Sequence, residues 1–437
     1  MAACLVVTGC TSDAEPSPVP SPSASSASPS ATGPVTLRFG VYGDKNLRQA
    51  YEKIARVYGN DHPDVTVEVE STRTEAEAAD KLDHQFSVGD EPDLFVASQD
   101  RVPRLSAEDR VQPVDQLLEA RGVTFGDNYQ RLGLEAFSAE QALQCMPYDV
   151  SPLVILYNQG LVPFRRLIEP GEDPLTPETG WTWEQFAKAV RLMSRDGVNG
   201  VYVEPGLSPL MALVRSAGSD IVDDPRAATT LTLDDDGTRS ALEDILAVLR
   251  EPRYTPSPQQ LARQDAVTRF AQGKIGMLVT TRAVVPELRK ADDLDFDVFP
   301  LPAMARPRTV AAVTGFCVSS TTEHLEEAAD FLAFASGEKG SKILAETGAV
   351  VPAYLPTLNS LSFTQPGEQP ESVLVFPEAV ARAGVTPYVP GWPQLEKGMQ
   401  PELERMFYAP VIDLDAMLPR MDEASSRILA PRAPTDG

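Results

Sequence analysis

CMPYDVSPLVILYN, residues 145–158, is the stretch that decides how this chain is organised. Its second half, from Leu153 to Asn158, is a continuous apolar run rich in β-branched residues, typical of a strand buried on both faces. Its first half carries two prolines and a Tyr-Asp pair, which suits a crossing segment or an edge better than a central strand. A second crossing candidate, VTGFCVSS, spans residues 313–320. We interpret both as hinge strands between two α/β lobes; periodicity alone also allows two unrelated strands of one domain.

The length and charge of the chain limit what it can be. At 437 residues it predicts two domains of roughly 150–200 residues each. Its net charge of −25 argues against a nucleic-acid partner, because phosphate binding needs clustered cations, and against electrostatic adhesion to anionic lipid. No apolar run approaches the roughly 20 residues that span a bilayer, so we expect no transmembrane helix.

The N-terminal region predicts a lipid anchor and a tether. LVVTGC, residues 5–10, resembles a bacterial lipobox, in which a diacylglycerol is attached to the cysteine, here Cys10, and the residues before it are removed. Residues 11–34 are almost wholly Ser, Pro, Ala and Thr, a composition that stays extended because it buries too little apolar surface. No Lys or Arg precedes the apolar run, so we expect the true start to lie upstream. The prediction is a signal at 1–10 and lipid anchoring at the outer face of the cell membrane; a disordered cytosolic tail is the alternative.

Processing at Cys10 leaves Cys145 and Cys317 as the other cysteines of the mature chain. Two such cysteines in an oxidising compartment are expected to be paired rather than free. Inert buried thiols are the alternative.

Hydrophobic periods predict a parallel sheet near the start of the folded region. Residues 35–41 alternate, residues 47–58 recur at helical spacing, and residues 65–69 alternate again. This is a βαβ unit, which requires a parallel sheet. A third strand is predicted at 93–97, and Thr182-Trp183-Glu184-Gln185 has the pattern of a capping box that begins a helix.

The sequence offers little to catalysis or metal binding. His62, His84 and His324 have no second histidine or cysteine at metal-ligand spacing. A Gly-rich phosphate loop and a nucleophile elbow are both missing. We therefore expect no cofactor, no metal and no enzymatic activity; a glycan-processing enzyme stays open because two carboxylates suffice for glycoside hydrolysis.

Polar residues follow two predicted strands at their carboxyl ends. YGDK, residues 42–45, follows the first strand, and SQDR, residues 98–101, follows the third. Open α/β sheets bind ligands at these ends. A carboxylate beside a cation offers acceptors and donors that suit the vicinal hydroxyls of a sugar. Solvent-exposed ion pairs are the alternative.

An ordered series of short motifs resembles the maltose-type extracellular solute-binding proteins of ABC importers. It includes GDEPDLF at 89–95, FAQGKIGM at 270–277, PLP at 300–302 and TPYVP at 386–390, in the family's order. The resemblance implies a two-lobed α/β fold of the type II periplasmic-binding class, with a hinge between discontinuous lobes that close on a solute. The lobes expected from it are 35–146 plus 317–352 and 147–316 plus 353–437. It also places the two cysteine-bearing hinge strands side by side.

The resemblance further implies a set of ligand-binding residues. They are Tyr42, Asp44, Lys45, Asp100, Arg101, Tyr148, Asp149, Glu204, Tyr388 and Trp392. Ala97, Gly206 and Ala283 stand where maltose binders use stacking aromatics, and Trp181 and Trp183 are expected in the core. Trp392 is therefore expected to be the stacking surface, which favours a smaller or different glycan over a maltodextrin.

The function expected from this resemblance is capture of a carbohydrate-like solute and its delivery to an ABC permease by a lipid-anchored monomer. Ligand that bridges both lobes binds the closed form better and shifts the population toward it. A binding protein for a polyol, a peptide or a siderophore is the alternative.

Overall fold

The computed structural model describes residues 33–430. The predicted lipobox with Cys10 and nearly all of the predicted tether lie outside the described residues. Within the described range, no helix combines the length and the apolar character needed to cross a membrane.

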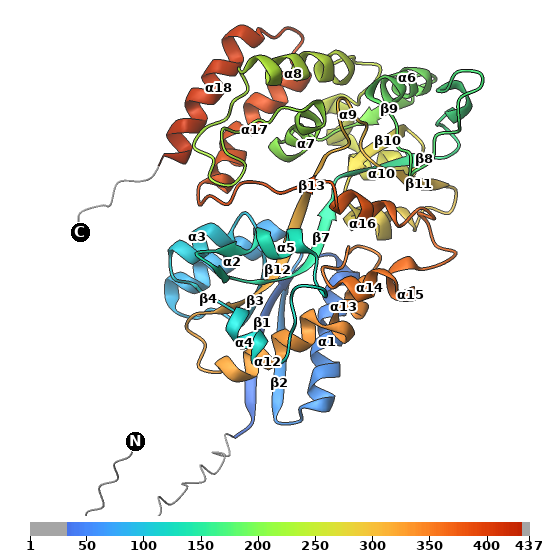
Figure 1. Ribbon diagram of the computed structural model, residues 1–437. Coiled ribbons are helices and arrows are strands. Elements are labelled where there is room, and N and C mark those ends of the chain that lie inside the picture. The colour runs from blue at the N-terminus through green and yellow to red at the C-terminus, as the bar shows by residue number, and fades with distance from the viewer. Residues whose placement is uncertain (1–32, 431–437) are drawn as a thin grey trace, which may run out of the picture. The chain divides into compact units, whose positions relative to one another are not determined.

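In the described part of the chain, seven strands form the largest sheet (Figure 1). They are β1 (Val35–Tyr42), β2 (Val65–Thr72), β3 (Leu94–Ser98), β4 (Val111–Gln112), β7 (Met146–Pro152), β12 (Thr309–Ser319) and β13 (Ala383–Gly384). Their order is β13-β12-β3-β1-β2, with β4 and β7 also paired to β12. Because β1 is parallel to both β2 and β3, the predicted βαβ unit is confirmed.

A second sheet contains the apolar half of the hinge stretch. Its strands are β8 (Val154–Asn158), β9 (Asn199–Tyr202), β10 (Ile275–Thr280) and β11 (Phe296–Phe299), in the order β11-β8-β10-β9. β8 lies between β10 and β11. Its side chains alternate between two hydrophobic cores, Val154 and Leu156 in one and Ile155 and Tyr157 in the other. The prediction of a strand buried on both faces is thereby confirmed. A short hairpin joins β5 (Ser138–Ala139) and β6 (Ala142–Leu143).

The helices divide between these two cores. One core runs through the largest sheet and continues over one face of the second sheet. Its helices are α1 (Lys45–Asp61), α2 (Glu75–Val88), α3 (Val102–Ala107), α4 (Asp115–Glu119), α5 (Arg131–Ala136), α10 (Ala266–Ala271), α11 (Val285–Leu288), α12 (Leu325–Ser336), α13 (Glu338–Ala345), α14 (Leu355–Leu358), α15 (Leu361–Thr364) and α16 (Val375–Val380). Figure 1 shows blue α1 beside orange α13, so segments distant in sequence share this core.

The other core covers the opposite face of the second sheet. Its helices are α6 (Trp183–Met193), α7 (Leu207–Ala217), α8 (Asp236–Leu249), α17 (Trp392–Tyr408) and α18 (Leu414–Leu429). The capping box at the start of α6 is confirmed, with the Thr182 hydroxyl accepting from the Gln185 amide and the Gln185 side chain accepting from the Thr182 amide. α9 (Pro258–Arg263) and the 3-10 turns η1 (Phe164–Arg166) and η2 (Arg282–Val284) complete the described elements.

The chain passes between the sheets at two places that bear on the hinge prediction. β7 belongs to the largest sheet and β8 to the second, with only Leu153 between them, so residues 145–158 form the first crossing as expected. β12 lies in the largest sheet over its whole length, and the second crossing is residues 300–308, between β11 and β12. The prediction of a crossing at 313–320 was therefore wrong by about ten residues, because an apolar run alone does not reveal which sheet pairs with it.

Three helices of the segment 353–437 belong to a different hydrophobic core from the rest of that segment. α14 and α15 contact α13, and α16 contacts β7. The sequence analysis placed residues 353–437 together in the second lobe. In the structure, α14, α15 and α16 belong to the core that the largest sheet shares with one face of the second sheet, and α17 and α18 belong to the core that contains α7 and α8.

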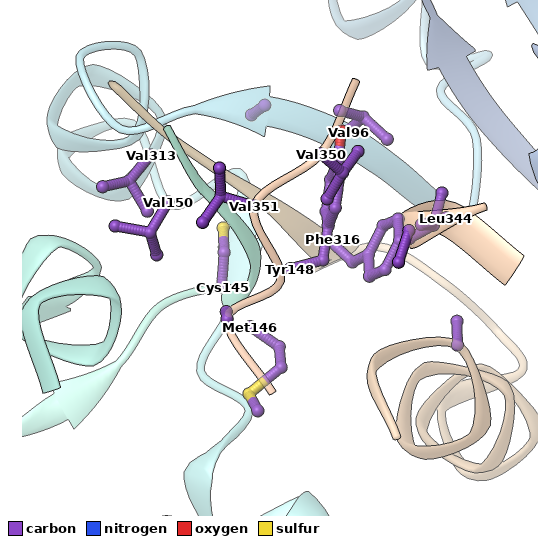
Figure 2. Close-up of a cluster of buried hydrophobic side chains, with 14 of the residues drawn as sticks. Val96, Cys145, Met146, Tyr148, Val150, Val313, Phe316, Leu344, Val350 and Val351 are labelled. Carbon is purple, nitrogen blue, oxygen red and sulfur yellow. The ribbon is translucent and has the colours of Figure 1, made fainter. Parts of the chain in front are cut away.

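A disulfide ties the hinge strands together. Cys145, directly before β7, is bonded to Cys317 in β12, and neither residue is exposed. β7 and β12 are antiparallel neighbours, with Met146 opposite Phe316. Figure 2 shows Cys145 with Met146, Val150 and Val351 in a cluster of buried hydrophobic side chains. The bond closes a loop with a sequence separation of 172 residues, so it reduces the conformational freedom of the unfolded chain. Both crossings lie within this loop.

Replacing both cysteines by alanine should lower the free energy of unfolding. The chain-entropy model gives about 5 kcal/mol for a loop of this length, an upper figure because residual unfolded structure reduces it, and native disulfides typically contribute about 2–5 kcal/mol. Denaturant unfolding of Cys145→Ala/Cys317→Ala beside the oxidised chain measures the loss. Dithiothreitol should destabilise the original chain and leave the variant unchanged. Two reactive thiols in the denatured, unreduced protein would contradict the bond.

Candidate functional site

A cavity of about 220 Å³ lies between the carboxyl ends of the parallel strands and the elements that pack around the second sheet. It is lined by Glu75, Ser98, Gln99, Asp100, Leu153, Ser208, Thr281, Val310, Ala311, Ala312, Val313, Thr386 and Glu396. The hinge strands supply its apolar residues, and loops and helix starts on both sides supply its polar ones. Parallel strands end at one edge of their sheet, which is why residues after β2 and β3 converge here.

The two residues of the predicted Asp100-Arg101 pair separate in the structure. Asp100 follows β3 and lines the cavity. Arg101 turns away, and its Nη2 donates to the two carboxylate oxygens of Asp83 in α2 at 3.1 and 3.2 Å. Asp100 therefore faces the cavity without Arg101 as a hydrogen-bond partner.

The residues that follow β1 have local roles. The Asp44 carboxylate accepts from the Leu47 amide at 2.8 Å and so caps α1. Lys45 is the exposed first residue of that helix. Neither residue lines the cavity. Tyr42 ends β1 and does not line the cavity either; burial first and then the charge of Glu75 raise the pKa of Tyr42 well above its usual value.

Tyr148 belongs to the core rather than to the cavity. Its ring stacks on Phe316 with centroids 4.4 Å apart, and its hydroxyl shares a 2.6 Å hydrogen bond with the Tyr51 hydroxyl. Figure 2 shows Tyr148 and Phe316 together in the apolar cluster. Only 6% of Tyr148 is exposed, so the expectation that it contacts ligand does not hold for this arrangement.

Asp149 supports the hinge from within. Its Oδ1 accepts from the Val351 amide at 2.8 Å and its carboxylate also accepts from the Ser151 hydroxyl. Burial raises the pKa of Asp149 to about 7, and these two hydrogen bonds and the charge of Arg282 oppose that rise. The carboxylate is engaged with the backbone of residues 350–352 and does not line the cavity.

Trp392 corrects the expectation of a stacking aromatic. It is fully buried at the start of α17, packed in the second core, so it offers no open ring face. Its Nε1 donates to Glu396 Oε1 at 3.1 Å, one turn further along the helix. The tryptophan thus holds the carboxylate that lines the cavity. Trp181 is buried as expected, whereas Trp183 is half-buried.

Glu204 and Tyr388 border different hollows. Glu204 lines an adjoining hollow of about 570 Å³ that shares Ser208 and Glu396 with the cavity. Tyr388 lines a larger one of about 1010 Å³, which shares only Gln99 and Thr386 with the cavity. Because the Gln99 amide donates to the Thr386 hydroxyl, this hydrogen bond stands between the two spaces.

Sequence reasoning missed several of the polar residues that line the cavity. Glu75 comes shortly after β2, so the rule that selected SQDR would also have selected it. Ser98 donates its hydroxyl to Glu75, which links the ends of two strands. Thr281 directly follows β10, so the same rule would have selected it as well, whereas Ser208 and Glu396 lie within α7 and α17 and carry no comparable signal.

Two of the three cavity carboxyls are shifted toward their neutral form. Burial raises the pKa of Glu396 to about 7, with further contributions from the charges of Asp100 and Glu75. Loss of water around the Glu75 carboxyl and the nearby Asp100 charge raise the pKa of Glu75. Across residues 33–430, no three His, Cys, Asp or Glu side chains are arranged to hold a metal ion.

The chain is similar to a described family. Residues 49–362 match the family of bacterial extracellular solute-binding proteins. No curated protein sequence is significantly similar.

Solved structures share the fold at low sequence identity. An ABC substrate-binding protein from Listeria monocytogenes in complex with cycloalternan has a TM-score of 0.79 at 18% identity, over 90% of this chain and 98% of that chain. MalE from Xanthomonas citri, a sugar-binding protein, has a TM-score of 0.76 at 15% identity, over 90% and 97%. The GacH receptor of Streptomyces glaucescens, solved unliganded and with acarbose, has a TM-score of 0.75 at 17% identity, over 90% and 98%. The two-lobed α/β fold expected from the sequence is confirmed.

Asp149→Asn should make stability less dependent on pH. The folded pKa of about 7 lies above the ordinary value of about 3.9, so the folded chain retains a proton that the unfolded chain loses. Its contribution is fully present below the unfolded pKa and is lost as pH rises toward 7. Urea unfolding between pH 5 and 8 should show a fall in the free energy of unfolding that is shallower in the variant, by up to about 1.4 kcal/mol per pH unit. Asp90→Asn, at an exposed carboxylate, should keep the original slope; equal slopes in all three proteins would refute the assignment.

Proposed function

The chain belongs to the family of bacterial extracellular solute-binding proteins, and from this premise we propose that it captures a carbohydrate between its two lobes and delivers it to an ABC permease. The observation that carries the proposal is the cavity itself, which takes Ser98, Gln99 and Asp100 from one lobe and Ser208 and Thr281 from the other. Hydroxyl, amide and carboxylate groups are the partners that fix sugar hydroxyls. Delivery to a permease is proposed on the basis of the family, and the proposed function includes no catalytic step.

Hinge closure is the proposed mechanism. A solute held by polar groups of both lobes gains contacts only when the lobes are together, so it binds the closed form better and shifts the population toward it. The crossings at 145–158 and 300–308 allow such a movement while the Cys145–Cys317 bond keeps β7 and β12 paired. The permease then has a loaded, closed form to recognise.

The size and lining of the cavity favour a small solute. Its volume of about 220 Å³ is less than that of most drug-sized pockets, which span about 300–1,000 Å³. None of the residues lining it is aromatic, so recognition rests on hydrogen bonds and not on ring stacking. A short sugar fits this lining, and a polyol is the second candidate for the same reason. A peptide or a siderophore is less suited to it.

Asp100→Ala should weaken sugar binding by about ten- to a hundredfold, because it removes a charged hydrogen-bond partner from the cavity. A thermal-shift screen of monosaccharides, disaccharides and polyols selects the titrant, since a ligand at 100 times its Kd stabilises by about 2.7 kcal/mol. Calorimetry then gives both affinities. Asp90→Ala is the matched control, because Asp90 precedes β3 at the opposite end from Asp100 and pairs with Arg38 on the surface. Equal affinity in the Asp100 variant and the original chain removes Asp100 from the site.

We place the mature protein at the outer face of the cell membrane, anchored through Cys10. Cys10→Ala should release the chain into the medium, because one acyl chain alone binds only marginally and a diacylglycerol supplies two, at about 0.8 kcal/mol for each buried methylene. Mass spectrometry of the native N-terminus is the direct measurement. A mature chain that begins anywhere other than a diacylated Cys10 would rule the anchor out.

A further inference from the structure

The cavity has an unusual balance of charge. Glu75 and Asp100 face it from the largest sheet's side, and Glu396 faces it from α17 on the other side. No lysine, arginine or histidine is among its lining residues. In the described part of the chain, none of the three carboxylates lies within 4.0 Å of a cationic group. Three acids from two lobes therefore converge on one space without an ion pair.

Two neighbouring cations, Arg101 and Lys397, do not line the cavity. Arg101 is close enough to lower the pKa of Glu75 slightly, yet its guanidinium is bonded to Asp83. Lys397 lines the adjoining hollow next to Glu204 and not the cavity. The acids are held by neutral donors instead, namely the Ser98 hydroxyl at Glu75 and the Trp392 indole at Glu396. Neutral donors orient a carboxylate but do not cancel its charge.

Gln99 gives an independent sign of a ligand that donates hydrogen bonds. Only 6% of Gln99 is exposed, and the residue lines the same cavity. Its amide nitrogen donates to Thr386, and its Oε1 is buried without a partner among the described residues. A buried acceptor left unpaired is costly, so the site calls for a donor. The carboxylates and this carbonyl oxygen all require the same kind of group.

The arrangement of the acids favours a larger group over a bare metal ion. The carboxyl side chains do not form a cluster that could hold a metal ion within residues 33–430. A larger cation, with hydrogen-bond donors several ångströms apart, can donate to the acids and to Gln99 together. Because Ser208 and Thr281 also line the cavity, such a ligand should carry hydroxyls that bond to them. An ammonium group placed on a sugar ring combines both features.

We propose that the solute is an amino sugar whose protonated amine is bound between Glu75, Asp100 and Glu396. This deepens the proposed function, on which it rests, by naming the class of carbohydrate. A protonated amine strengthens closure in a way that a hydroxyl does not, because it is attracted to acids on both lobes at once and relieves the repulsion between them. The partial loss of water around Glu396 makes this attraction stronger than it would be at the surface.

Calorimetry with three disaccharides that differ only at carbon 2 tests the charge. Chitobiose carries amines, cellobiose carries hydroxyls, and N,N′-diacetylchitobiose carries neutral amides. At neutral pH and low salt, chitobiose should bind the full chain at least about tenfold more tightly than the other two. Glu396→Gln and Asp100→Asn should each reduce that preference by about tenfold, and raising the salt concentration should also reduce it. Asp90→Asn, outside the cavity, should leave the preference unchanged.

The outcomes separate the two proposals. If the neutral disaccharides bind as tightly as chitobiose, and Asp100→Ala abolishes their binding, the cavity is a sugar site and the amine is refuted. If the preference for chitobiose survives in both carboxamide variants, the amine is bound by other groups and the assignment is refuted. If none of the three, nor any sugar of the thermal-shift screen, binds at millimolar concentration, the proposed function fails together with this inference.

Discussion

The antiparallel pairing of β7 with β12 is the contact on which the rest of the structure depends. β12 pairs with β3 on its other side, so one strand connects the parallel sheet to the hinge. The register shifts between Thr314 and Gly315, and a side chain at Gly315 would lie within 3.0 Å of the Phe137 ring and the Met146 carbonyl. Only glycine allows the two strands to approach so closely, and the Cys145–Cys317 bond holds them there. Because β8 begins one residue after β7, this pairing also sets where the second sheet starts.

A buried arginine completes the junction. Arg282 follows β10 of the second sheet, is fully buried, and donates to the carbonyl oxygens of Gly348 at 2.8 Å and Phe363 at 3.0 Å. Its guanidinium also lies over the Phe363 ring, 4.2 Å from the centroid. Burial lowers the pKa of Arg282 to about 9 while the charge of Asp149 raises it. A buried charge is stable only when such partners surround it, so this contact anchors the second sheet to residues 348–363. α15, which contains Phe363, therefore contacts both Arg282 and α13.

Most of the architecture could be predicted from local sequence patterns, and most of the site could not. The βαβ unit, the strand at 153–158 and the cap at Thr182 depend on periods of two or 3.6 residues and on neighbours in sequence, which the chain displays directly. Asp100 was predictable because it follows a strand. Glu396 and Trp392 show the limit: the helix places them one turn apart, but which of the two faces the cavity depends on packing against the second core. Tyr148 and Arg101 likewise have partners, Tyr51 and Asp83, that lie far from them in sequence.

Water decides which acids of this acidic chain matter for recognition. The chain carries a net charge of −25, and at an exposed position each carboxylate is solvated and screened, so it contributes little to the choice of ligand. A carboxylate between two lobes loses that water as they approach, and its repulsion toward neighbouring acids grows because the local dielectric constant falls. In the proposed hinge closure, bringing three acids together is therefore unfavourable until a ligand replaces the contacts that water made with them. A solute shifts the hinge only by the difference between its affinities for the open and closed forms, so a group that interacts with acids from both lobes is more effective than several that interact with one. The charge of the cavity, and not that of the surface, is then the part of this acidic composition that can select a solute.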